Sequence, residues 1–267
     1  MGDVFSRQPF LRAGVFLGRT TKAADLQALV RTLRIMPIDR PLIRVGPASD
    51  GGYLLPDDLE EIQHCFSPGV AGCSDFEVQL ANRGMQAYLA DRSVDGPAAP
   101  HPNFRFIKKF LASTDDPADG LMTLDTWYRT EVGPVSATSP EAVLQMDIEG
   151  AEYEVLLNTP DALLNRFRIL VIEFHRLHQL AERQSFQWMS CAFRKLLRNH
   201  AVVHAHPNNH RRILNCGGVQ IPGVLEMTFL RRDRFRPGTA PVVIPHPLDA
   251  INVPSRPEVP LPACWYR

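Results

Sequence analysis

The chain has 267 residues, of which 45% are hydrophobic and 22% charged, a composition typical of a globular protein with one α/β domain and some additional segments. Lys plus Arg and Asp plus Glu both number 29, so the formal net charge is zero and the strong basic footprint of a nucleic-acid-binding protein is missing. We therefore expect no nucleic-acid partner.

The lack of a recognisable targeting segment and the pattern of cysteines lead us to expect an intracellular protein. No apolar run approaches the roughly 20 residues needed to cross a bilayer, and the N-terminus lacks the apolar region of a signal peptide. The five cysteines are scattered without a CxxC pair, which favours reduced thiols over a disulfide framework or a zinc site. We expect a cytoplasmic protein without a membrane span, and a homo-oligomer is left open.

The first part of the chain predicts a helical segment, residues 1–40, ahead of the main domain. Thr20 and Thr21 can cap a helix whose apolar residues recur at helical spacing. These residues are Leu26, Leu29, Val30 and Leu33. Residues 42–53 then read as a strand or turn, and Asp50-Gly51-Gly52 within them as a tight turn.

From residue 62 the pattern alternates between strands and helices. Strands are predicted at 62–66, 86–90, 104–107, 143–146, 168–174, 201–205 and 224–230, and helices at 74–84, 151–157 and 185–198. This alternation implies an α/β fold: a Rossmann-like, mostly parallel sheet covered by helices, with a final antiparallel hairpin. The domain is expected to span 41–236. Residues 237–267 contain eight prolines and favour an extended arm across the domain or a partner over a poorly ordered end.

The loop after the first core strand is the candidate cofactor loop. Residues 67–72 carry Gly69 and Gly72, and Ser74-x-x-Glu77 reads as a capping box for the next helix. Asp91 ends the following strand 22 residues after Gly69, where an acid can bind ribose hydroxyls. The loop lacks the G-x-G-x-x-G cradle that a pyrophosphate needs, which favours a nucleoside cofactor without phosphate.

Acidic and histidine side chains gather at the ends of the next two strands. Asp147 ends a buried strand, and Glu173 and His175 lie two residues apart at the end of the neighbouring one, so both can face the Asp147 site. Glu152 and Glu154 are interpreted as structural acids of a helix start. Asp147, Glu173 and His175 are therefore the candidate catalytic residues.

A third polar cluster follows the predicted strand at 201–205. Its hydrogen-bonding groups suit a polyhydroxylated ligand, and its two histidines have the period-two spacing of metal ligands. The candidate substrate-binding residues are His204, His206, Asn208 and Asn209.

Several motifs together resemble the FkbM-like methyltransferase family, over roughly residues 40–232. They are Arg44-Val45-Gly46, Asp50-Gly51-Gly52-Tyr53, Phe66-Ser67-Pro68-Gly69-Val70 through Asp75-Phe76-Glu77, Thr123-Leu124-Asp125, Asp147-Ile148-Glu149-Gly150-Ala151-Glu152-Tyr153, Glu173-Phe174-His175 and His206-Pro207-Asn208-Asn209. The resemblance implies a class I methyltransferase fold that uses S-adenosyl-L-methionine to methylate hydroxyls of sugars or natural products.

This resemblance also implies where the cofactor binds. The candidate cofactor-binding residues are Asp50, Ser67, Gly69, Ser74, Asp91 and Asp147. Ser67-Pro68 stands where many methyltransferases have an acid, so Asp50 or Arg44 is the candidate for holding the methionine end of the cofactor.

The predicted reaction needs a base that takes the hydroxyl proton during methyl transfer. We assign this role to His175, oriented by Asp147 or Glu173, with His204 or His206 as the alternative base. A second hypothesis places Mg²⁺ or Ca²⁺ on Asp147, Glu173 and His175. The competing functions are a non-catalytic Rossmann-like carbohydrate or nucleoside binding module and, third, a nicotinamide-dependent oxidoreductase.

Overall fold

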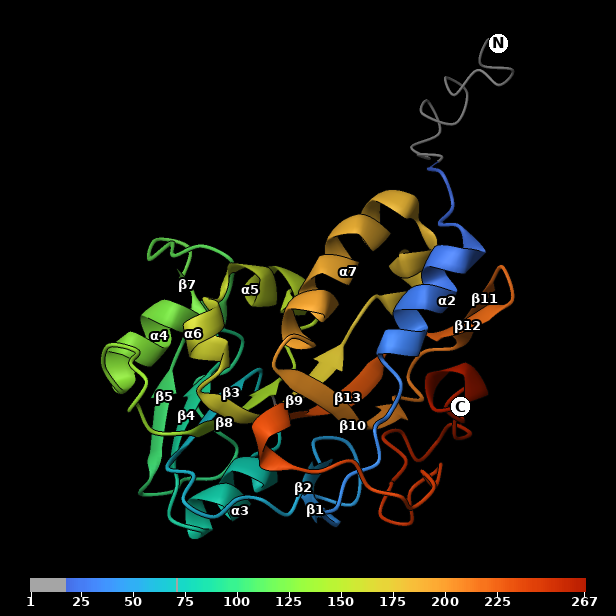
Figure 1. Cartoon of the computed structure of the whole chain (residues 1–267). Coiled ribbons are helices and arrows are strands. Elements are labelled where there is room, and N and C mark those ends of the chain that lie inside the picture. Colours follow the sequence, from blue (N-terminus) through green and yellow to red (C-terminus); the bar gives the residue numbers. More distant parts are fainter. Residues whose placement is uncertain (1–17, 71) are drawn as a thin grey trace.

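The computed structural model describes residues 18–70 and 72–267, and its centre is a seven-stranded sheet (Figure 1). The strands lie in the order β10-β13-β9-β8-β3-β4-β5, and β13 alone runs antiparallel to its neighbours. Their bounds are β3 (His64–Pro68), β4 (Gln86–Ala90), β5 (Phe104–Ile107), β8 (Ala142–Met146), β9 (Phe167–Phe174), β10 (His200–Pro207) and β13 (Leu225–Arg231). The predicted mostly parallel sheet with a final antiparallel hairpin is confirmed.

Helices and short strands cover both faces of this sheet. The helices are α2 (Ala23–Thr32), α3 (Asp75–Asn82), α4 (Leu124–Glu131), α5 (Glu152–Asn158), α6 (Asp161–Leu164) and α7 (Arg183–Leu196), with 3-10 turns η1 (Leu177–Ala181), η2 (Arg232–Arg234) and η3 (Ala263–Trp265). Three two-stranded sheets pair β1 (Leu42–Val45) with β2 (Tyr53–Pro56), β6 (Phe110–Leu111) with β7 (Leu121–Met122), and β11 (Ile213–Cys216) with β12 (Val219–Pro222).

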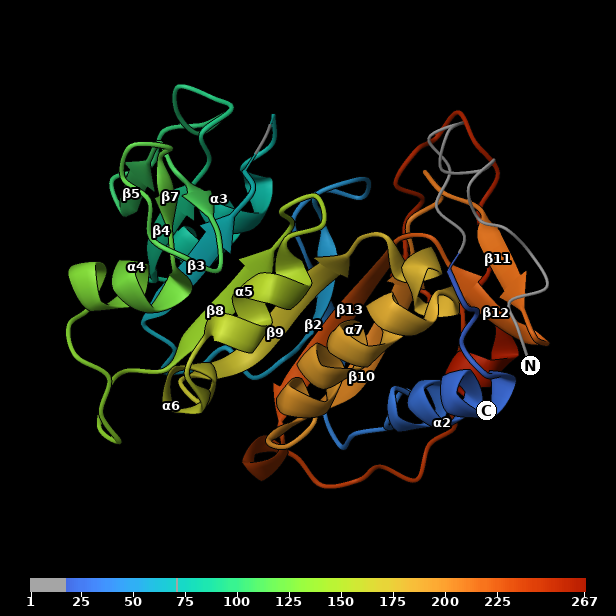
Figure 2. The same ribbon diagram turned by 90° about the horizontal axis from the view of Figure 1, so that it is seen from above.

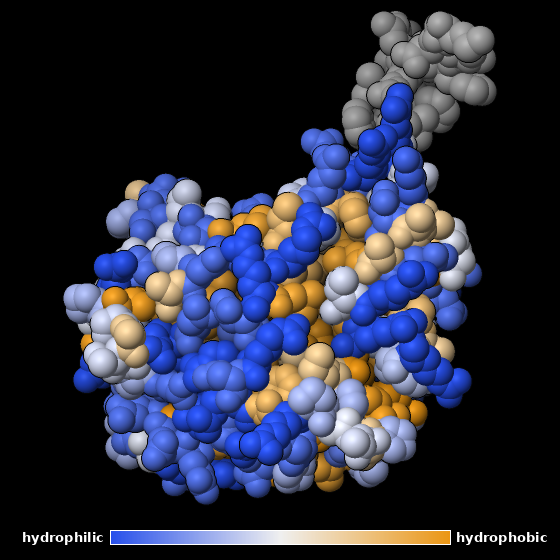
Figure 3. Space-filling model, in the orientation of Figure 1, coloured by the Kyte–Doolittle hydropathy of each residue, from blue (hydrophilic) through white to orange (hydrophobic). Residues whose placement is uncertain are grey.

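The two faces have separate hydrophobic cores. One core combines apolar residues of α2, α4, α5, α6 and α7 with one side of the sheet, and these helices lie together over it in Figure 2. The other core packs α3 and the β1–β2 hairpin against the opposite side, below the sheet in Figure 1. On the face shown in Figure 3 polar residues predominate, and apolar residues gather around α7 and α2. Within residues 18–70 and 72–267, no helix has the length and apolarity to cross a membrane.

The side-chain caps predicted for two helices are not made, although both helices form and Ser74 occupies the N-cap position of α3. The N-cap of α2 is Lys22, and the Thr21 hydroxyl instead donates to the carbonyl of Leu180 at 2.7 Å, which ties α2 to η1. At α3 the Ser74 hydroxyl makes no cap and accepts from the backbone N–H of Ala98 at 3.0 Å. In both cases a tertiary partner replaces the local helix-start bond.

Residues 237–267 consist of turns, bends and irregular segments that contact the domain, and η3 lies near their end. Near its beginning, this segment donates from Gly238 N to the carbonyl of Pro37 at 2.8 Å. Near its end, Trp265 is fully buried in the core that contains α2, and its indole N–H donates to the carbonyl of Gln220 at 2.8 Å. The segment, here called the C-terminal arm, therefore contributes a large core side chain.

The sheet topology gathers the candidate residues at one edge. The parallel strands β3, β4, β8 and β9 all end at this edge, and the antiparallel strand β13 begins there. The strand order changes direction at β3, whose neighbours are β4 and β8. In open α/β sheets, ligands bind outside the carboxyl ends of the strands at such a switch point.

Candidate functional site

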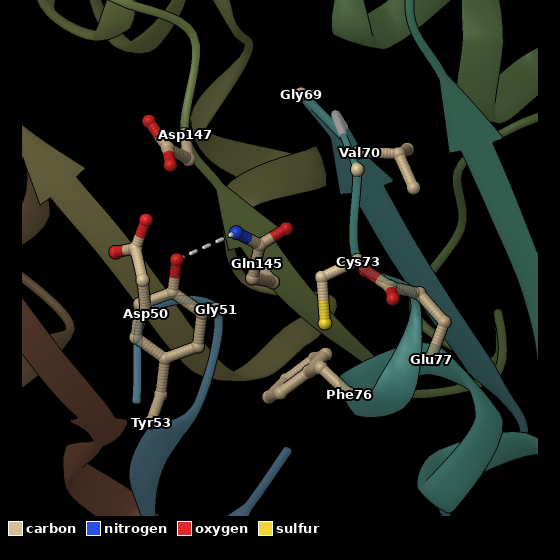
Figure 4. A pocket seen from close by; sticks show the side chains of 11 residues that line it. Asp50, Gly51, Tyr53, Gly69, Val70, Cys73, Phe76, Glu77, Gln145 and Asp147 are labelled. Carbon is tan, nitrogen blue, oxygen red and sulfur yellow. Dashed lines mark hydrogen bonds between the residues drawn. The ribbon is translucent and has the colours of Figure 1, made fainter. Parts of the chain in front are cut away.

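A cavity of about 260 Å³ opens at the switch point, between the loop after β3 and the end of β8. Its lining includes Asp50, Tyr53, Gly69, Gln145 and Asp147. Figure 4 shows Asp50 and Tyr53, both from the β1–β2 hairpin, and Asp147, from the end of β8, directed toward the same space. The β1–β2 hairpin thus brings Asp50 to the sheet edge.

Gly69 allows the cofactor loop to lie against the backbone of Asp147. Its φ is +88°, and a Cβ at this position would lie 1.6 Å from the carbonyl oxygen of Asp147. The backbone N–H of Asp147 donates to the carbonyl of Pro68 at 3.2 Å, which joins the two loops. Only glycine combines this φ with this close approach.

Ser67 and Glu77 belong to a buried hydrogen-bond network that includes Tyr53 and Gln145 of the cavity wall. Ser67 Oγ lies 2.5 Å from Glu77 Oε1 and 2.6 Å from Gln145 Oε1, and the Gln145 amide donates to the Tyr53 hydroxyl at 3.3 Å. Ser67 is fully buried. Burial raises the pKa of Glu77, an effect that the Ser67 hydrogen bond opposes. Ser67 therefore supports the cavity wall through this network.

Arg44 and Asp91 differ from the residues that line this cavity. The Arg44 guanidinium donates to the carbonyls of Pro47, Ser49, Gly52 and Leu248, so it holds the hairpin loop and the C-terminal arm. Asp91, at the end of β4, is buried, and its Oδ1 accepts from Ser93 N at 2.7 Å and Ser93 Oγ at 2.6 Å. Asp91 keeps the strand-end position expected of a ribose-binding acid but is not among the residues lining the first cavity.

His175 is held by a residue that the sequence interpretation set aside. Its Nδ1 lies 2.9 Å from Oε1 of Glu152, which also accepts from the backbone N–H of Gly150 at 2.9 Å. Glu152 is fully buried at the start of α5. The carboxylate that orients His175 is thus Glu152, because the first turn of α5 packs beside the end of β9, and neither Asp147 nor Glu173 takes this role.

The other ring nitrogen of His175 faces three carboxylates. Nε2 lies 3.5 Å from Glu149, 3.6 Å from Glu173 and 3.8 Å from Asp147. Burial lowers the pKa of His175, but the Glu152 hydrogen bond and the surrounding carboxylate charges outweigh it, and the net shift is upward.

The pKa of Asp147 is raised as well. Burial is the main cause and brings it to about 7; the negative charges of Glu149 and Glu152 add to the shift, while His175 opposes it. Glu149 itself adopts a left-handed conformation, with φ of 56°. Such backbone strain is most often retained where a side chain must be aimed at a site.

Glu173 connects this group to a second acidic cluster. Carboxylate oxygens of Asp50, Glu173 and Glu226 lie within 4.8 Å of one another, as do ligand atoms of Asp147, Glu149 and His175. The Asn208 amide donates to Glu173 at 3.0 Å, and the amide of Asn252, from the C-terminal arm, donates to both Asp50 and Glu226. Burial, followed by the charges of Asp147 and Glu226, holds the pKa of Glu173 well above its usual range.

Most of the predicted substrate-binding residues have internal partners. His204 Nε2 lies 2.9 Å from Asp249 of the C-terminal arm, and His206 Nδ1 lies 3.5 Å from Glu226. The Asn209 amide donates to the carbonyls of Val253, Arg256 and Pro257, and its oxygen accepts from Val253 N. His204 and Asn209 therefore hold the C-terminal arm, and His206 and Asn208 contact the acidic cluster through Glu226 and Glu173.

A second cavity, of about 440 Å³, has His175 in its lining, which the first cavity does not. Glu149 and His175 line it together with residues of η1 and of the segment before β11. Asp147 lines the first cavity and is 3.8 Å from His175 in the second. Asp147 and His175 thus form a direct contact between the walls of the two cavities.

The strand order, the antiparallel β13 and the cavity at the switch point define a class I methyltransferase fold. Residues 121–216, which include Asp147, Glu152, Glu173 and His175, match the family model of the methyltransferase FkbM domain. This match agrees with the resemblance to the FkbM-like methyltransferase family that the motifs in this part of the chain show. No curated protein sequence is similar enough to count as a relative.

Solved structures of methyltransferases have a distant similarity to the chain. A putative methyltransferase from an antibiotic biosynthesis pathway of Anabaena variabilis is 15% identical, with a TM-score of 0.30; the match covers 57% of this chain and 60% of that one. Magnesium protoporphyrin IX methyltransferase from Synechocystis, with bound S-adenosylmethionine, is 10% identical over 65% of this chain and 72% of that one, with a TM-score of 0.33. A 16S rRNA adenine methyltransferase from Catenulisporales acidiphilia is 12% identical over 73% and 100%, with a TM-score of 0.31.

Proposed function

We propose that the protein is an S-adenosyl-L-methionine-dependent O-methyltransferase that acts on a hydroxyl of a sugar or of a sugar-containing or natural-product small molecule. The observation that carries the proposal is the pair formed by His175 and Glu152 at 2.9 Å, next to the cavity bounded by Gly69 and Asp147. A histidine held by a buried carboxylate is the arrangement of a general base.

The first cavity fits a cationic cofactor without phosphate. Its floor is the Gly69 loop, which places backbone near the ligand, and Asp50 and Asp147 provide carboxylates. Oδ1 of Asp147 is buried without a hydrogen-bond partner among the described residues. Such an orphaned acceptor suits the amino or sulfonium group of S-adenosylmethionine. Asp91, at the end of β4, is proposed to bind the ribose hydroxyls.

S-adenosylmethionine, when bound, supplies an electrophilic methyl group on a sulfonium. His175 Nε2 would accept the proton of the acceptor hydroxyl, and transfer of the methyl group from sulfur to that oxygen would leave S-adenosylhomocysteine. Glu152 accepts the Nδ1 hydrogen and keeps the ring in one orientation, and the carboxylates of Asp147 and Glu173 stabilise the imidazolium that forms. Positioning of the hydroxyl supplies the rest of the catalysis.

A divalent cation, Mg²⁺ or Ca²⁺, is a second way to activate the hydroxyl in the same site. Asp147, Glu173 and His175 are the proposed ligands, and Oε2 of the buried Glu173 has no hydrogen-bond partner among the described residues. An ion on Nε2 would replace the base function of His175, so the two hypotheses exclude each other. We expect activity to survive exhaustive chelation if His175 is the base and to be lost if the cation is needed.

The test of the function uses two measurements. S-adenosylhomocysteine is expected to raise the melting temperature and NAD to leave it unchanged, because a ligand stabilises the folded state it binds. Labelled S-adenosylmethionine is then incubated with a panel of sugars and glycosides, with His175→Ala as the blank. Stabilisation by NAD would favour an oxidoreductase, and ligand binding without transfer to any hydroxyl would favour a non-catalytic binding module.

A further inference from the structure

The second cavity carries a positive charge that the proposed chemistry does not use. Its lining includes Glu149, His175, Arg176, His178, Arg211 and Arg212. The guanidinium groups therefore share one hollow with the proposed base. In a protein whose formal net charge is zero, three arginines and one carboxylate in a single cavity are a local excess of positive charge.

Two glycines make room for two of these arginines. A Cβ at Gly150 would lie 2.8 Å from Nε of Arg176, and a Cβ at Gly223 would lie 2.7 Å from Cβ of Arg211. Arg176 itself adopts a left-handed conformation, with φ of 56°, directly after His175. The backbone is thus shaped so that both arginine side chains lie close against it beside the base.

These arginines differ from the others that line the sheet. At the opposite edge, Arg168 and Arg231 form ion pairs with Glu141. No hydrogen bond or ion pair is made by the guanidinium groups of Arg176, Arg211 or Arg212 to any residue that the structure describes. Burial, then the charges of Arg211 and Arg176, lowers the pKa of His178 in the same cavity. The positive charge is therefore not neutralised within the protein.

We propose that this cavity binds the acceptor and that the acceptor carries an anionic group, a carboxylate or a phosphate, held by the exposed guanidinium groups of Arg176, Arg211 and Arg212. Guanidinium groups bind both anions through paired charge-assisted hydrogen bonds. The proposal rests on the proposed function and narrows its substrate class to acidic saccharides. When the arginines hold the anionic group of such a sugar, the neighbouring hydroxyls lie beside His175.

The test measures binding and does not need turnover. Glucuronate, glucose 6-phosphate and glucose are titrated into the full chain, with and without S-adenosylhomocysteine, and binding is followed by saturation-transfer NMR. The first two sugars separate a carboxylate from a phosphate. At least one of them is expected to bind ten or more times more tightly than glucose, and the difference should shrink at high salt.

The variant Arg176→Gln/Arg211→Gln is expected to lose at least tenfold in affinity for the anionic sugar and to keep its affinity for S-adenosylhomocysteine. Arg83→Gln, an exposed arginine at the end of α3, is the matched control and should behave as wild type. Equal binding of glucose and both anions, or full retention by the double variant, would overturn this inference alone. If the wild-type protein did not bind S-adenosylhomocysteine, the result would instead contradict the proposed function.

Discussion

Nδ1 of His175 lies 2.9 Å from Oε1 of Glu152, a fully buried carboxylate that also accepts from the backbone N–H of Gly150. This contact directs Nε2 of the same ring toward Asp147 and Glu173. The imidazole is therefore oriented from behind by one acid and faces the proposed reaction space with its other nitrogen.

The first prediction concerns this pair. His175→Ala is expected to lower kcat by about 10²-fold or more, the usual contribution of a general base. Glu152→Gln keeps the shape but weakens the orienting bond and is expected to lower kcat about 10-fold to 100-fold. Kinetics with a saturating acceptor measure both effects. Affinity for S-adenosylhomocysteine should stay unchanged, and near-normal turnover of His175→Ala would refute the base assignment.

The second prediction concerns pH. The base must lose its proton before it can act, so the rate should be low at acidic pH and rise as His175 and Asp147 titrate together. The pKa of Asp147 is about 7 because of burial, and the neighbouring carboxylates raise the pKa of His175. Asp147→Asn removes a negative charge that raises the pKa of His175, so the inflection should move to lower pH. A pH profile of kcat measures it; an unmoved inflection would show that Asp147 does not influence the base.

The third prediction uses two glycines of the same loop. Gly69→Ala should destabilise the fold and abolish cofactor binding, because the new Cβ would meet the Asp147 carbonyl and φ is +88°. A cost of about 1–3 kcal/mol from the backbone strain alone is expected. Gly72→Ala is the control, since a Cβ there has no neighbour within 4 Å. Thermal melts with and without S-adenosylhomocysteine compare the two, and equal melting temperatures would contradict the close approach.

The fourth prediction concerns the C-terminal arm. Asn209→Ala removes an amide that bonds Val253, Arg256 and Pro257, so the arm should detach more often. We expect faster limited proteolysis within residues 250–260 and a lower melting temperature. Asn215→Ala, in the β11–β12 hairpin, is the control, because it makes the same substitution at an asparagine that does not contact the arm. An unchanged cleavage rate for Asn209→Ala would mean that other contacts suffice to hold the arm.

Strands β4 and β5 have the bounds that the sequence predicts, because each is a short apolar run with polar or turn residues on both sides. The position of β13 between β9 and β10 could not be read from the chain, since strand order depends on which sheet faces pack together. Helix α4 was missed although Thr123 caps it by accepting from Thr126 N, because its sequence between two loops has few apolar residues.

In the candidate site, the residues at the strand ends could be predicted from the sequence, but the residues that they contact could not. Asp147, Glu173 and His175 meet because parallel strands end at one edge, which follows from the alternating pattern. Glu152 looked like an ordinary helix-start acid, and only its complete burial distinguishes it. His204 was expected to contact substrate but contacts Asp249, because nothing in the sequence tells where a proline-rich arm lies.

Asn252 of that arm donates to Asp50 and Glu226, which come from opposite ends of the domain sequence. A chain that extends only to residue 250 therefore lacks the Asn252 amide that donates to these two carboxylates. A polypeptide that stops shortly before Asn252 should keep all seven strands of the main sheet and leave Asp50 and Glu226 with one hydrogen-bond donor fewer.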